Sequence, residues 1–161
     1  MIKKVPTLFL KASLIVLGLM GLGVCIIMFW GLAGEGIRNM SYFDRLLTPL
    51  VLIMWLTLIP FFISLFQAWK LLTYIDKNIA FSELSRVALK KIKYCAFTIC
   101  VLYISALPQF YILAQADDAP GVMIIALMFV GAPLTIAVFA AVLEKLVESA
   151  MQIKSENELT V

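Results

Sequence analysis

Charged residues are missing from four long stretches of this chain, and their spacing predicts its structure. No Asp, Glu, Lys or Arg occurs in residues 12–34, 46–69, 94–116 or 119–143, which hold 23, 24, 23 and 25 residues. A helix of roughly 20 apolar residues crosses the ~30 Å hydrocarbon layer of a bilayer, so each stretch is long enough to span it with some tilt. Core helices of soluble proteins rarely run so far without a charge. The pattern predicts four transmembrane helices.

The flanking polar residues set approximate limits for these elements. We expect one all-α transmembrane domain over residues 1–161, a four-helix bundle. Its helices are predicted at about 8–33, 46–73, 82–115 and 120–154, with a polar connection at about 74–93. The first segment also follows two lysines, as a signal peptide would. A signal-peptide apolar core is about 7–15 residues long, whereas this run has 23 residues. We therefore expect the segment to be retained.

The distribution of lysine and arginine predicts the orientation. Of the 13 basic residues, 11 precede the first helix, lie between the second and third, or follow the fourth, and two lie between the first and second. Basic residues resist translocation and accumulate on the cytoplasmic side. Both termini and the 74–93 connection are therefore predicted to be cytoplasmic in a multi-pass protein of the cell membrane.

The connection YIDKNIAFSELSRVALKKIKY, residues 74–94, holds five basic and two acidic residues. Ser82 is a suitable N-cap for a helix that runs into the third span. One face of this helix is charged: Glu83, Arg86, Lys90 and Lys93. The opposite face is apolar: Leu84, Ala88, Leu89 and Ile92. The segment is thus an amphipathic helix.

Composition argues against most catalytic chemistry. The chain is 63% hydrophobic and 14% charged, against about 25% charged in soluble domains. It contains no histidine, which is the commonest general base and metal ligand. Cys25, Cys95 and Cys100 lack CxxC spacing, and we interpret them as small apolar packing residues. No phosphate loop or nucleophile motif is present, so we expect no enzymatic activity and no cofactor.

Three prolines fall inside the predicted second, third and fourth spans: Pro60, Pro108 and Pro133. Proline removes a backbone hydrogen bond and kinks a helix, and Gln109 adds an amide at a similar depth. Two interpretations stay open. These residues shape kinks and interhelical hydrogen bonds, or they line a cavity for a small ligand. No charge lies at mid-depth, where an ion or proton path normally has one.

The basic connection also has two interpretations. It anchors the topology against anionic lipid, where each basic residue contributes about 1 kcal/mol, or it docks a cytosolic partner through Arg86, Lys90 and Lys93. Direct nucleic-acid binding is not expected, because the patch is small and lacks a DNA-binding motif. The two roles are compatible. The oligomeric state does not follow from the sequence.

The segments FQAWKLLTYIDKNIAFSELSRVALKKIKYCA and KSENELTV resemble domain-of-unknown-function family 2975, a group of bacterial four-helix membrane proteins. The similarity extends over nearly the whole chain. The resemblance implies an integral plasma-membrane protein, often encoded beside a small helix-turn-helix regulator. The family has no assigned catalytic or ligand-binding residues, so none is carried over.

The function we expect is non-enzymatic. The chain is predicted to be a regulatory or scaffold protein that presents a cytoplasmic surface to a small partner such as a helix-turn-helix regulator. The alternative is a small transporter or immunity-type protein with a cavity for a peptide or lipid.

The basic asymmetry gives a first testable prediction. A reporter fused after Val161 is expected to read cytoplasmic, and one inserted near Asn39 external, because 11 of the 13 basic residues lie on the side of the termini. Paired phosphatase and fluorescent-protein fusions measure this. Two fusions that report the same side would contradict four spans.

Overall fold

The computed structural model consists of four long α-helices: α1 (Lys4–Gly34), α2 (Tyr42–Asp76), α3 (Glu83–Ala116) and α4 (Gly121–Leu159). It describes residues 4–34, 42–116 and 118–159, with the backbone alone for residues 4–6, 28–29, 31–34, 42–47 and 158–159. All four helices are long and apolar enough to cross a membrane. The predicted all-α fold with four spans is confirmed.

The helix limits differ from the predicted ones mainly at three places. α1 begins at Lys4 rather than near residue 8, α2 begins at Tyr42 rather than near residue 46, and α4 ends at Leu159 rather than near residue 154. α3 begins at Glu83 and continues without a break into its apolar part. Most of the predicted external connection, residues 35–41, lies outside the described residues.

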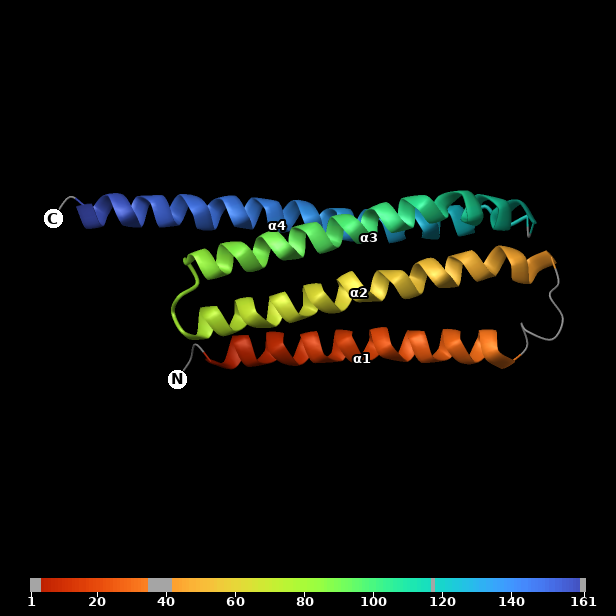
Figure 1. The fold of residues 1–161 in the computed structure, drawn as a ribbon, viewed down its shortest axis with the longest axis horizontal. Coiled ribbons are helices and arrows are strands. Elements are labelled where there is room, and N and C mark those ends of the chain that lie inside the picture. The colour runs from red at the N-terminus through yellow and green to blue at the C-terminus, as the bar shows by residue number, and fades with distance from the viewer. Residues whose placement is uncertain (1–3, 35–41, 117, 160–161) are drawn as a thin grey trace.

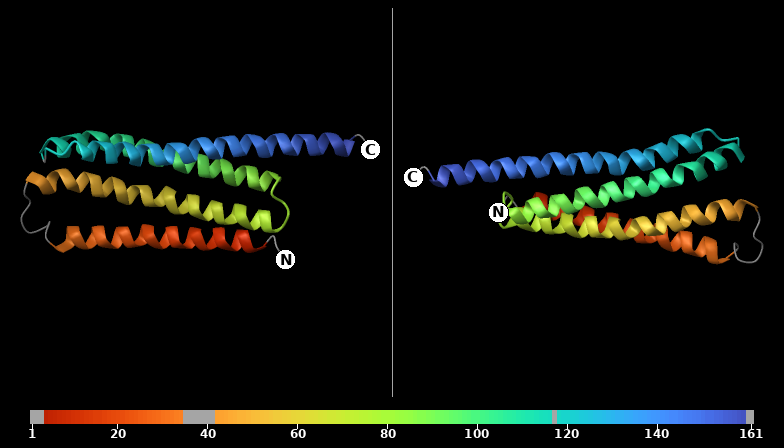
Figure 2. Two further views of the ribbon diagram at one scale, coloured as in Figure 1. Left: turned by 180° about the vertical axis from the view of Figure 1, so that it is seen from behind. Right: turned by 45° about the horizontal axis from the view of Figure 1, so that its top comes forward.

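The helices run antiparallel and pack in chain order (Figure 1). Contacts join α1 to α2, α2 to α3 and α3 to α4, and in the described ranges no other pair of helices has backbones this close. The bundle is therefore open, with α1 and α4 at its two edges (Figure 2). One end carries the start of α1, the end of α2, the start of α3 and the end of α4. We call it the basic end, because it carries the basic connection.

Small side chains let α3 and α4 approach each other closely. α4 buries one repeat against α3: Pro133, Ala137, Ala140, Glu144 and Val147. α3 buries a matching repeat: Ser85, Leu89, Ile92, Ala96 and Cys100. Most of these positions alternate in steps of four and three, the spacing of a helix seam. Alanines in that seam allow the close approach on which helix packing in lipid depends.

Most large apolar side chains point outward rather than into a core. Ile27 is 74% exposed and Phe139 65% exposed. Exposed apolar surface on this scale is unusual in a soluble monomer. In a bilayer the same side chains contact lipid.

Glycines in α1 determine how α1 packs against α2. A Cβ at Gly21 would lie 2.9 Å from Cε1 of Phe61, whereas a Cβ at Gly23 would meet nothing within 4 Å. Gly18 has ordinary contacts with Phe62 and Leu65. Gly21 therefore receives the Phe61 ring, and Gly23 faces away from the neighbouring helices.

The turn after α2 begins the return of the chain at the basic end. Asn78 has a positive φ of 57°, its N–H donates to the carbonyl of Ile75, and the N–H of Ile79 donates to that of Tyr74. This is a Schellman motif, in which Asn is one of the few residues that tolerate the left-handed position. A β-branched residue at position 78 would strain the turn.

Ser82 occupies the predicted cap position at the start of α3. Its carbonyl accepts from the N–H groups of Ser85 and Arg86. Its hydroxyl has no hydrogen-bond partner. The position was predicted correctly, but the side-chain cap is not formed in this structure.

The two α1 glycines provide a matched test of the α1–α2 contact. Gly23→Ala is expected to raise stability by up to about 1 kcal/mol, because alanine favours the helix and its Cβ meets open space. Gly21→Ala is expected to be less stable than Gly23→Ala by roughly 1–3 kcal/mol, because its Cβ overpacks Phe61. Thermal unfolding in detergent measures both variants. Equal melting temperatures would contradict the contact.

Candidate functional site

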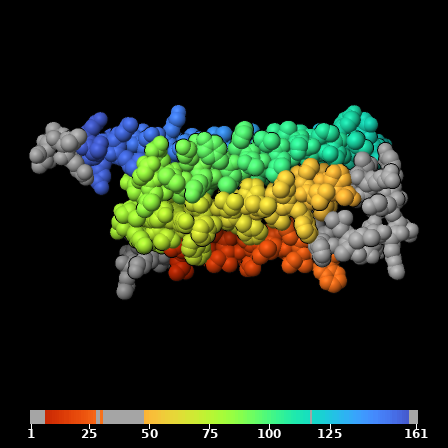
Figure 3. Space-filling model, viewed as in Figure 1, coloured from red at the N-terminus to blue at the C-terminus, as the bar shows by residue number. Residues whose placement is uncertain are grey.

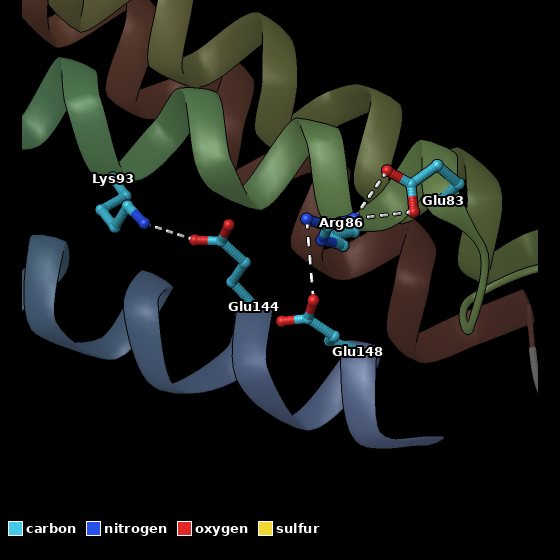
Figure 4. Close-up of polar contacts among 5 residues, drawn as sticks. All are labelled: Glu83, Arg86, Lys93, Glu144 and Glu148. Atoms are coloured by element: carbon cyan, nitrogen blue, oxygen red, sulfur yellow. Dashed lines mark hydrogen bonds and ion pairs between the residues drawn. The ribbon is translucent and has the colours of Figure 1, made fainter. Parts of the chain in front are cut away.

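The first turns of α3 lie against the last turns of α4 through two ion-pair groups. Lys93 of α3 donates to Oε2 of Glu144 on α4 at 2.6 Å (Figure 4). Glu144 is buried, and the Lys93 side chain is about one-third exposed. A buried carboxylate needs a partner because desolvation disfavours its charge. The pair therefore fixes the register of α3 and α4 where their apolar spans end.

Arg86 forms the second group, two turns closer to the start of α3. Its guanidinium donates to both oxygens of Glu83, at 3.0 and 3.2 Å, and lies 3.7 Å from Oε1 of Glu148 (Figure 4). Glu144 and Glu148 are four residues apart, so both project from one face of α4 toward α3. Arg86 and Lys93 are seven residues apart and meet them from one face of α3.

The structure divides the predicted basic face. Arg86 and Lys93 bind carboxylates of the same molecule, whereas Lys90 is exposed, as is its neighbour Lys91. Among the residues that the structure describes, neither Lys90 nor Lys91 forms an ion pair. Arg86 and Lys93 thus hold the helices together, and the outward charge lies on Lys90 and Lys91.

The apolar face of the amphipathic segment is buried over most of its length. Ala88, Leu89 and Ile92 are buried as predicted, whereas Leu84 is 55% exposed. Leu84 and Val87, which is 41% exposed, lie on the same outward side of α3 as the two free lysines. An apolar surface flanked by lysines results at the start of α3.

Sequence reasoning missed the acidic half of this site. Glu144 and Glu148 directly follow the charge-free stretch 119–143 at a spacing of four. Arg86 and Lys93 precede the charge-free stretch 94–116 at a spacing of seven. Two antiparallel helices with these charges at the same membrane boundary can pair them, so the pattern was present in the sequence.

A separate ion pair joins α1 to α2 at the basic end. Nζ of Lys11 pairs with Asp76 and lies 5.7 Å from the centroid of the Trp69 ring. Lys70 lies 4.6 Å from the Phe66 ring. Lysines at a membrane boundary commonly extend along aromatic side chains toward water. This arrangement is typical of an interfacial anchor.

The three prolines do not lie in one plane. Tyr103 of α3 contacts Phe129 of α4, with ring centroids 5.6 Å apart. Pro108 lies five residues from Tyr103 toward the end opposite the basic end, and Pro133 lies four residues from Phe129 toward the basic end. The two prolines therefore lie on opposite sides of this contact, with Pro108 farther from the basic end than Pro133.

The prolines also differ in burial, and Gln109 bonds locally. Pro133 is buried, Pro60 half-buried and Pro108 exposed. When the Gln109 amide nitrogen is oriented toward the carbonyl oxygens of Ala106 and Ser105, it donates to both at 3.1 Å. These carbonyls are not the one that Pro108 leaves without its helical N–H partner, which belongs to Ile104.

A cavity of about 290 Å³ opens between the helices. Its lining is apolar and comes from all four helices, including Met20 of α1, Phe61 of α2, Ile99 of α3 and Phe129 of α4. Pro60, Pro108, Gln109 and Pro133 are not among its lining residues. The residues predicted as cavity candidates therefore do not mark this cavity.

Over the described ranges, no group of three or more His, Cys, Asp or Glu side chains is arranged to hold a metal ion. Cys25, Cys95 and Cys100 are free thiols there. The arrangement at the basic end offers binding and positioning rather than a nucleophile with a base.

Comparison with known proteins decides the family. The model of a family described as a protein of unknown function, DUF2975, matches residues 4–161. The chain belongs to the DUF2975 family. A relative from Bacillus subtilis (strain 168), described as the uncharacterized membrane protein YoaS, is 47% identical over 161 residues, which cover 98% of this chain and 99% of the relative. No solved structure matches the chain.

These similarities agree with the fold. This DUF2975 chain is a multi-pass membrane protein with four apolar helices. No enzymatic family is indicated. The resemblance seen in the sequence is thus confirmed at the level of the family.

The Lys93–Glu144 pair gives a further prediction. Lys93→Met is expected to lower stability by about 1–3 kcal/mol, because Glu144 loses its partner while buried. The exchanged variant Lys93→Glu with Glu144→Lys is expected to recover much of that loss, since the pair re-forms with reversed charges. Thermal unfolding in detergent measures each step. A double variant no more stable than Lys93→Glu alone would show that the pair does not hold α3 to α4.

Proposed function

We propose that this chain is a non-enzymatic regulatory or scaffold protein of the membrane that holds a small cytosolic partner. The docking surface is the outward side of the first turns of α3, formed by Leu84, Val87, Lys90 and Lys91. The observation that supports it most is the division of the basic face. Two cations hold α3 to α4, and two lysines beside exposed apolar side chains remain outward.

The form of this surface suits a protein partner. Interfaces commonly combine an apolar centre with a polar rim, and Leu84 and Val87 lie beside lysines in that manner. The ion pairs to α4 keep the surface in one position, so little order is lost on binding. Electrostatic complementarity calls for acidic groups on the partner.

The partner class comes from the family resemblance. A small helix-turn-helix regulator is a suitable candidate, since such regulators are often encoded beside proteins of this kind. A regulator whose own acidic surface binds these lysines would be held at the membrane. It would be kept from DNA until its release. Lysines at this level also attract anionic lipid, and anchoring and docking are compatible.

A second candidate function rests on the cavity. Its 290 Å³ volume and apolar lining suit part of a lipid chain or an apolar peptide side chain. This supports a small transporter or immunity-type protein as the alternative. Such a function is expected not to depend on Lys90 and Lys91, which lie outside the cavity lining.

Charge reversal on the docking surface separates the proposals. The double variant Lys90→Glu and Lys91→Glu is expected to weaken partner co-purification from native membranes roughly tenfold, equivalent to about 1.4 kcal/mol. The physical reason is repulsion between the new carboxylates and an acidic partner surface. Quantitative pull-down with mass spectrometry measures retention.

The matched control is Lys77→Glu with Lys145→Glu, which changes net charge equally at two other exposed lysines of the basic end. This variant is expected to retain the partner. Equal loss in both double variants would leave only the lipid-anchor role, and equal retention in both would contradict the docking surface. Membrane insertion, measured by fractionation, is expected to be unchanged in both.

A further inference from the structure

α4 carries a second apolar repeat beside the one that packs on α3. Its members are Ala132, Ile136, Phe139, Leu143, Leu146, Ala150 and Ile153. The spacing alternates four and three throughout, and none of the seven is buried within the chain. The first five each lie one residue before a position of the α3-facing seam, about 100° around the helix, and Ala150 and Ile153 continue the repeat beyond it. We call this set the second seam.

A repeat of 3.5 residues is the pattern by which one helix packs along another. Within the charge-free stretch nearly every residue of α4 is apolar, so the spacing is informative mainly after Glu144, where Leu146, Ala150 and Ile153 lie among polar residues. A spacing of four and three that continues among polar residues is typical of a helix face that packs on another helix.

The second seam continues beyond the part of α4 that lipid covers. Glu144 ends the charge-free stretch, and Leu146, Ala150 and Ile153 follow it. Leu146 is 59% exposed and Ile153 61% exposed. α4 projects past the connection of α2 and α3 at this end (Figure 3). Water would meet these side chains, so burial against a protein is favoured.

We propose that the second seam pairs with the same seam of a second copy of this chain, as a parallel two-stranded coiled coil. Two copies inserted into one membrane in the same way have parallel α4 helices, and a two-fold axis along the membrane normal brings identical seams together. α4 lies at an open edge of the bundle, and its backbone comes close to no described helix except α3. Nothing in the described chain needs to move.

Three features of the sequence fit a second copy of this chain as the partner of the second seam. Asn157 continues the repeat at the position type of Leu143 and Ala150, and a single Asn there specifies register and number of strands in parallel dimers. Ala132 and Ala150 allow close approach of two backbones. In the parallel register Lys154 lies opposite Ser149 of the other copy, so no like charges face each other.

This inference does not depend on the docking surface, which is on α3. Dimerisation through α4 would leave Lys90 and Lys91 exposed on each copy. A dimeric membrane protein would then present two docking surfaces on the same side of the membrane.

Disulfide trapping in native membranes tests the pairing. Cys25, Cys95 and Cys100 are first replaced by Ala, and single cysteines are then introduced as Leu146→Cys or Ile153→Cys. The matched controls are Lys145→Cys and Gln152→Cys, each one residue earlier, exposed, and on another side of α4. A disulfide needs Cβ atoms about 3.5–4.5 Å apart. Both seam variants are expected to form covalent dimers several-fold more than their controls after mild oxidation.

The outcomes are decisive in both directions. Equal dimer yields at seam and control positions, or cross-links of Leu146→Cys and Ile153→Cys only to other proteins, would overturn the proposal. Light scattering in mild detergent provides an independent measurement. The unmodified chain is expected at twice its 18.0 kDa mass and the Leu146→Lys, Ile153→Lys variant at its single mass. If the unmodified chain is monomeric and also gives no seam-specific cross-link in membranes, the proposed dimer through α4 is contradicted.

Discussion

The close packing of α3 on α4, closed by the Lys93–Glu144 pair, determines what the basic end presents. Alanines bring the two backbones together in lipid, where no hydrophobic effect drives one helix onto another. The buried carboxylate of Glu144 then requires a cation at one level of α3. The helices slide past each other only if that pair breaks. The outward side of α3 is fixed as a consequence.

This arrangement explains why a chain with so few charges pairs them within itself. At a membrane boundary an unpaired carboxylate is poorly solvated, whereas a lysine reaches water through its long stem. The glutamates of α4 therefore take partners on α3, and Lys90 and Lys91 extend outward. A regulatory or scaffold role would use Lys90 and Lys91, the charges that take no part in the ion pairs between α3 and α4.

The open order of helices has a consequence of its own. Because α1 packs only on α2 and α4 only on α3 within the described chain, both edges offer long apolar faces. Along most of their length lipid covers these faces. Of these two helices, α4 extends further past the charge that ends its apolar stretch, from Glu144 to Leu159, whereas α1 begins at Lys4, seven residues before Lys11. α4 is therefore the edge where a second copy has most to bury.

The sequence by itself determined the number and type of elements. Charge-free stretches of 23 to 25 residues leave the backbone no alternative to helices in hydrocarbon, and the spans follow from length alone. The amphipathic start of α3 was predictable from its period. Only the tertiary structure decided which of its cations face α4, because Arg86, Lys90 and Lys93 lie on one side of an isolated helix. The neighbouring helix, and not the helical period, supplies the carboxylates that separate them. The levels of Pro108 and Pro133 likewise depend on the register between helices, which residue spacing within one helix does not contain.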